Sequence, residues 1–117
     1  MSAKEGDREN LALVRVLVLF GTPVDRAGFE QHFERDYHPL LLQVPNLTQL
    51  DINRIAGAAK GESPFYMVVE MHFASEQDMQ QGLNSEAGQA MASGLSQFAS
   101  GGVTVLFSQS ESQKLIR

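Results

Sequence analysis

Residues 64–73, Pro-Phe-Tyr-Met-Val-Val-Glu-Met-His-Phe, are the stretch that decides the fold. Apolar residues occupy every second position from Phe65 to Phe73, and a period of two predicts a strand with one face in a core. The other face is expected to carry Tyr66, Val68, Glu70 and His72. The stretch therefore predicts a strand that is apolar on one face and mixed on the other.

Further elements lie on both sides of this strand. The stretches 11–20, 47–55 and 103–108 have strand composition, with branched and aromatic apolar residues. Helices are expected over residues 26–37, 76–83 and 86–99, where apolar residues recur every three or four positions and Asp25, Ser75 or Ser85 precedes the first turn. The order β-α-β-β-α-β is that of the ferredoxin-like α+β fold. Right-handed crossovers would place the helices on one face of a four-stranded antiparallel sheet.

The bulk properties fit one soluble domain. The chain has 117 residues, no cysteine and a net charge of −5. Disulfides and thiolate catalysis are thereby excluded, and nucleic acid and anionic membranes are disfavoured as partners. The polar first residues have no signal-peptide pattern, so a cytoplasmic location is expected. We expect a flexible tail at 1–10, one domain at 11–109 and a C-terminal tail at 110–117.

The sheet face away from the helices predicts self-association. It is expected to expose leucine or valine residues of the first strand, and with them Leu50, Ile52, Tyr66 and Val68. Apolar area of this size is rarely left in water. A homodimer that stacks sheet on sheet would cover it.

Three groups of residues resemble a known family. They are Tyr37-His38-Pro39-Leu40 with Val44-Pro45-Asn46-Leu47, then Phe73-Ala-Ser-Glu with Ser85-Glu-Ala-Gly-Gln-Ala, and finally Phe98-Ala-Ser-Gly-Gly-Val-Thr-Val-Leu. In this order the chain resembles the EthD family of the dimeric α+β barrel superfamily. Asn46 stands where that family usually has glycine, and Gly94 stands where an acidic residue is expected. The resemblance implies a ferredoxin-like dimer and a loose association with oxidoreductase systems; superfamily relatives include monooxygenases, lactone isomerases and polyketide cyclases.

His38 is the first candidate for chemistry. Because proline disfavours α geometry in the preceding residue, His38 is expected where helical geometry gives way, before Pro39. The apolar stripe of Phe29, Phe33, Tyr37, Leu40 and Val44 leaves the alternative of a kinked or second short helix past Pro39. Its imidazole could act as a general acid or base, with Glu34 orienting the ring. The hydroxyls of Tyr37 and Tyr66 could polarise a substrate oxygen. Alternatively, His38 only complements the helix dipole.

A second candidate set combines a cation, a carboxylate and an imidazole. Glu70 and His72 share one face of a strand, and Arg15 lies in the middle of the first strand. They would form either a proton-transfer site or an ion-paired patch in a dimer interface, and the second is favoured because buried ions need partners. The sequence leaves open whether Arg15 points to the same face of the sheet as Glu70 and His72.

No metal site or cofactor is predicted. His32 and Asp36 have i, i+4 spacing, but two ligands are too few, and an exposed pair is favoured. Haem held by His38 and His72 is an alternative that no spacing demands.

The sequence predicts a cleft between helices and sheet that binds a small hydrophobic molecule, with His38 at its mouth and Phe33 among the binding residues. An enzyme on this scaffold would be monooxygenase-like or isomerase/cyclase-like, and would transfer protons or oxygenate its substrate without a cofactor. A non-catalytic accessory protein for a partner oxidoreductase and a purely structural dimer are the alternatives.

Overall fold

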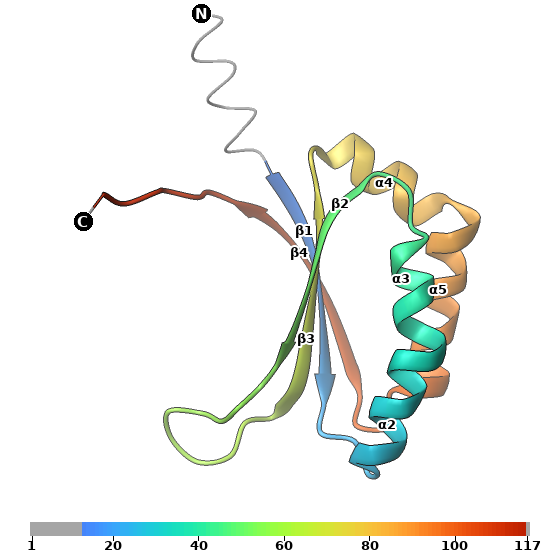
Figure 1. Cartoon of the computed structure of the whole chain (residues 1–117), viewed down its shortest axis with the longest axis vertical. Helices are drawn as coiled ribbons and strands as arrows, with labels where there is room; N and C mark the ends of the chain where they lie inside the picture. The colour runs from blue at the N-terminus through green and yellow to red at the C-terminus, as the bar shows by residue number, and fades with distance from the viewer. Residues whose placement is uncertain (1–12, 117) are drawn as a thin grey trace, which may run out of the picture.

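The computed structural model describes residues 13–116 and shows the predicted ferredoxin-like architecture (Figure 1). Its strands are β1 (Leu13–Gly21), β2 (Leu47–Arg54), β3 (Phe65–Phe73) and β4 (Val103–Ser110). Its helical segments are α2 (Arg26–His32), η1 (Phe33–Tyr37), α3 (His38–Leu42), α4 (Glu76–Asn84) and α5 (Glu86–Phe98). The strands form one antiparallel sheet in the order β2-β3-β1-β4, and the helices cover one of its faces (Figure 1). The tail expected at residues 1–10 lies outside the described residues.

The core lies between the sheet and the helices. Alternate residues of the two central strands face it: Val14, Val16, Val18 and Phe20 from β1, and Met67, Val69, Met71 and Phe73 from β3. The helices add an aromatic group, of which Phe29, Phe33, Tyr37 and Phe98 are the members. Burying alternate apolar positions of both central strands is the main stabilising term of this fold.

The helical segment around His38 continues through Pro39. His38 has α dihedrals (φ −56°, ψ −44°), and its N–H donates to Phe33 O, five residues back. Proline lacks an N–H and its ring clashes with the carbonyl four residues earlier, and the wider π turn of η1 accommodates both effects. The expectation that helical geometry gives way at His38 is therefore wrong, and the alternative of a second short helix past Pro39 is confirmed, because the chain changes helix type there and the helix ends at Leu42.

Two bulges decide which side chains face the core. Tyr66 is the extra residue of β3, because Phe20 pairs with Met67 and Gly21 with Phe65. Tyr66 therefore packs against the core instead of lying on the open sheet face. Thr48 is the extra residue of β2, and Leu50 and Ile52 likewise pack against the core. The prediction that Tyr66, Leu50 and Ile52 lie on the open face is wrong, since each bulge shifts the alternation by one residue.

The predicted caps are confirmed. The side chains of Asp25, Ser75 and Ser85 accept from the backbone N–H three residues later, at 3.1, 3.1 and 3.0 Å. The last strand is longer than predicted, because Gln109 and Ser110 still pair with β1. Residues 111–116 are exposed and have no regular structure. No helix in the described part of the chain is long and apolar enough to cross a membrane.

Candidate functional site

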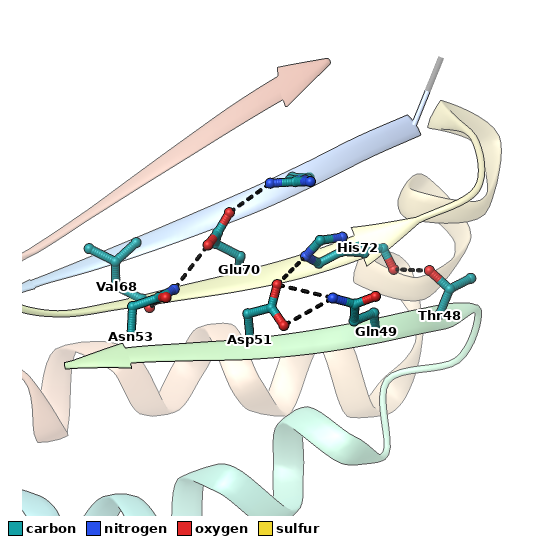
Figure 2. Close-up of polar contacts among 8 residues, drawn as sticks. Thr48, Gln49, Asp51, Asn53, Val68, Glu70 and His72 are labelled. Carbon is teal, nitrogen blue, oxygen red and sulfur yellow. Dashed lines mark hydrogen bonds and ion pairs between the residues drawn. The ribbon is translucent and has the colours of Figure 1, made fainter. Parts of the chain in front are cut away.

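The face of the sheet that carries no helix holds a polar network (Figure 2). Asp51 on β2 accepts from Gln49 Nε2 at 3.0 Å, and its Oδ2 lies 2.8 Å from His72 Nε2 on β3. Glu70 accepts from Arg15 Nη1 at 3.0 Å and from Asn53 Nδ2 at 2.9 Å. Each carboxylate is therefore held by two side chains: Asp51 by one from its own strand and one from β3, and Glu70 by one from each neighbouring strand.

Strand register explains why these residues meet. Arg15 is the direct partner of His72, and Asp51 is the direct partner of Glu70. Directly opposed residues of antiparallel strands point to the same face, so all four side chains emerge together. The predicted set of Arg15, Glu70 and His72 does come together. Its partner residues Gln49, Asp51 and Asn53 were missed, although their alternation with Leu50 and Ile52 is visible in the sequence.

The network is partly shielded from water, which strengthens its internal contacts. His72 is 8% exposed, and the side chains of Arg15 and Glu70 are 28% and 22% exposed. The Gln49 amide, followed by His72, holds the pKa of Asp51 below its usual range. An ionised Asp51 that contacts the ring of His72 fixes the orientation of the imidazole, as an acid–base group requires.

The candidates on the helices lie elsewhere. Tyr37 is 2% exposed, stacks on Phe98 with a centroid separation of 5.1 Å, and its hydroxyl has no hydrogen-bond partner among the described residues. Burial raises the pKa of Tyr37 above its usual value. Phe33 is fully buried, and the His38 ring lies 5.7 Å from it. Glu34 is exposed, and no hydrogen bond joins it to His38 within residues 13–116. The predicted catalytic trio is thus not assembled in this structure.

Tyr66 belongs to a third group. Its hydroxyl donates to Glu30 Oε2 at 2.6 Å, and Arg54 binds the same carboxylate with its Nη2 at 2.8 Å from Oε1. Arg54, together with Tyr66, holds the pKa of Glu30 below its usual range despite the opposing effect of burial. Glu30 and Arg54 come from α2 and β2, so sequence spacing offered no signal for this pairing. Its place between a helix and a sheet edge suits a structural role.

An apolar hollow opens between α5 and the sheet. Its volume is about 160 Å³. It is lined by Val16, Val18, Leu83, Gly88, Met91, Ala92, Leu95, Val105 and Phe107, and we call this set the α5 hollow. The small side chain of Ala92 leaves room where α5 passes over the sheet, whereas Gly88 allows the close approach of α5 to α4, because a Cβ there would collide with Gly82 O. The predicted helix–sheet cleft thus has a counterpart, but His38 is not among its lining residues.

Metal ligands are not gathered in the described structure. Within residues 13–116, no three histidine, aspartate or glutamate side chains converge in a way that could hold an ion. His32 and Asp36 form the predicted i, i+4 pair at 3.7 Å, and both are about half exposed.

Comparisons with known proteins agree with this architecture. A curated relative, an uncharacterized 11.0 kDa protein in the thcB-thcC intergenic region of Rhodococcus erythropolis, is 29% identical over 99 residues, which cover 85% of this chain and 96% of the relative. The crystal structure of an ethyl tert-butyl ether d (EthD) family protein from Bacillus halodurans matches with a TM-score of 0.79 and 28% identity, covering 83% of this chain and 97% of that one.

More distant structures share the fold alone. Hydroxynitrile lyase from Passiflora edulis matches with a TM-score of 0.68 and 18% identity, over 90% of this chain and 99% of that one. A dimeric protein of unknown function with a ferredoxin-like fold, from Bacteroides fragilis, matches with a TM-score of 0.59 and 12% identity, over 84% and 96% of the two chains.

The EthD domain model matches residues 22–102. That match spans most of the chain, from the turn after β1 to the turn before β4, and the chain therefore belongs to the EthD family.

Proposed function

We propose that this protein binds a small, largely apolar organic molecule in the α5 hollow. The apolar lining of this space is the observation that supports the proposal. An enclosed apolar cavity of about 150 Å³ in another protein accepts benzene. The α5 hollow has a similar volume of about 160 Å³ but opens at the surface, where Val105 and Phe107 are exposed, so it has room for a molecule of one ring or a compact branched group. Binding would be favoured by removal of apolar surface from water.

A filling substitution tests the proposal. Ala92 lines the hollow, whereas Ala90, also exposed on the same helix, lies outside it. Ala92→Leu should abolish the binding of benzene and toluene, measured by chemical-shift titration, because the added side chain occupies the space. Ala90→Leu is the matched control and should bind as the unchanged protein does. Absence of any saturable binding by the unchanged protein would refute the proposal.

We also propose a homodimer built through the open sheet face. That face carries apolar residues beside the polar network, among them Leu13, Leu17, Leu19, Val68 and Leu106. Apolar surface of this kind marks an interface. The Bacteroides fragilis structure of the same fold is described as dimeric, which agrees with the proposal.

Leu17→Lys tests this interface. Leu17 is the cross-strand partner of both Glu70 and Leu106, so a lysine there has a carboxylate beside it in the monomer but is costly to bury against a second sheet. Sedimentation should show loss of the dimer with little loss of folded protein. Ala90→Leu, on the helix face, should sediment unchanged, and a dimer that survives Leu17→Lys would contradict this arrangement.

Catalysis is a further step. A role for His38 with Tyr37 and Glu34, in cofactor-free proton transfer or oxygenation, stays a prediction. So do a cytoplasmic location and the lack of nucleic-acid and membrane partners. Once a ligand is known, product analysis separates the alternatives: an enzyme converts it, and the accessory protein for a partner oxidoreductase returns it unchanged.

A further inference from the structure

A second hollow continues the first along the same groove. It has a volume of about 180 Å³ and is lined by Val14, Glu76, Met79, Phe107, Ser108 and Gln109. Val14 is the residue before Val16 on the buried face of β1. The two are about 7 Å apart along the strand, which is the rise of two residues. Met79 and Leu83 likewise lie one turn apart on α4. The floor and the roof of the two hollows are therefore continuous.

Phe107 separates the two spaces. Among residues 13–116 it alone lines both, and it stands opposite Val16 in the β1–β4 pairing. Its side chain is 63% exposed although it is large and apolar. A ring exposed to this degree is not packed in the core. Its position is that of a boundary between the two hollows.

The two compartments differ in chemistry. The α5 hollow is lined by apolar side chains. The second adds the Glu76 carboxyl group and the Gln109 amide to its apolar residues. Ser108 stands opposite Arg15, so its side chain points to the other face of the sheet and its hydroxyl is not part of the hollow. A carboxylate accepts hydrogen bonds and repels anions, and the net charge of −5 on the chain acts in the same direction.

We propose that the groove selects a two-part ligand: an apolar ring or branched group in the α5 hollow, and a hydrogen-bond donor, a hydroxyl or amine, beyond Phe107 near Glu76. Phe107 sets the size limit of the apolar compartment and Glu76 disfavours carboxylates at the other end. The inference rests on the proposed function, because it requires that the α5 hollow binds a ligand at all.

The charge part is tested with two probes of equal length. Phenylpropanol and phenylpropanoate share a ring and a propyl linker, and differ in whether the far end donates a hydrogen bond or carries a negative charge. The unchanged protein should bind the alcohol more tightly by severalfold, because Glu76 is exposed and like charges about 4 Å apart in water repel by about 1 kcal/mol. Glu76→Gln should reduce this ratio severalfold, because the amide does not repel the carboxylate. Glu86→Gln, at the equivalent first position of α5 and outside both hollows, should leave the ratio unchanged.

The size part is tested at Phe107. Phe107→Ala should weaken benzene binding and strengthen the binding of naphthylpropanol relative to phenylpropanol, because the wall between the compartments is lost. Leu42→Ala is the control, since Leu42 is likewise a large exposed apolar residue and lies outside both hollows and the open sheet face. Should Phe107→Ala fail to fold, Phe107→Leu carries the same test with a smaller change.

The outcomes separate the two proposals. If benzene binds and Ala92→Leu blocks it, but Glu76→Gln and Phe107→Ala behave as their controls do, the proposed function stands and the two-compartment groove is refuted. If no probe binds the unchanged protein, both are refuted. A tighter fit of phenylpropanoate than of phenylpropanol would overturn the assignment of Glu76 directly.

Discussion

The Tyr37 hydroxyl offers the sharpest test of the structure. It is buried with the ring among Phe20, Phe33 and Phe98, and no described residue hydrogen-bonds to it. Burying a hydroxyl without a partner costs about 1–3 kcal/mol in protein mutational data. Tyr37→Phe removes the hydroxyl and keeps the ring. We therefore expect the free energy of unfolding to rise by about 1 kcal/mol or more, and the midpoint of thermal unfolding by roughly 4 °C.

Tyr66→Phe is the matched control with the opposite sign. The Tyr66 hydroxyl donates to the Glu30 carboxylate at 2.6 Å. Loss of a hydrogen bond to a charged group costs about 1.5–3 kcal/mol, and we expect the low end of this range because Arg54 still binds Glu30. Urea unfolding at neutral pH, with unchanged slope, measures both variants. If Tyr37→Phe destabilised the protein as much as Tyr66→Phe, the Tyr37 hydroxyl would have a partner, and our account of it would be wrong. A confirmed gain would mean that the protein carries a hydroxyl at a cost to stability, as functional groups often do.

Three further predictions concern the stability of the fold. Gly82→Ala should destabilise the protein by about 1–3 kcal/mol in urea unfolding, because a Cβ there would lie 2.5 Å from Pro45 O, whereas Gly57→Ala, with no atom near its Cβ, should not. Asn46→Ala should cost about 1 kcal/mol by the same assay, because Asn46 has φ 68°, and Asn46→Gly should cost less. The pKa of Glu30 is lowered in the folded protein, so its ionised carboxylate stabilises the fold above the unfolded pKa, and this stability is lost as pH falls through the folded pKa. Glu30→Gln should therefore reduce the loss of unfolding free energy at acid pH, measured by urea unfolding at a series of pH values. An unchanged loss would contradict the role of Arg54.

Much of the fold follows from local pattern. Alternation over β3 and helical periodicity over α5 depend on one chain segment at a time, and so do the caps at Asp25, Ser75 and Ser85. These signals need no knowledge of neighbours in space. Element order and the ferredoxin-like topology were therefore predicted correctly, apart from the type of helical turn before Pro39.

The errors came from features that two strands decide together. A bulge is defined by pairing, so the extra residues Tyr66 and Thr48 carry no mark in their own strand. Each shifts the alternation and changes which residues reach the core. The candidate set of Arg15, Glu70 and His72 was identifiable because alternation shows the shared face of Glu70 and His72, while the place of Arg15 depended on the β1–β3 register. Asp51 joined the network only through the register that Thr48 sets.

The bulge at Thr48 also explains how one face can hold charges and still be suited to burial. It turns Leu50 and Ile52 toward the core, and thereby places Asp51 on the open face opposite Glu70. Two neighbouring carboxylates on a covered face would repel each other and lose hydration, which is costly unless each has partners of its own. Here each carboxylate already has two, all from the same chain. A second copy stacked on this face would therefore need to supply only apolar contacts, and the polar network would add specificity of orientation without depending on the partner for its charges.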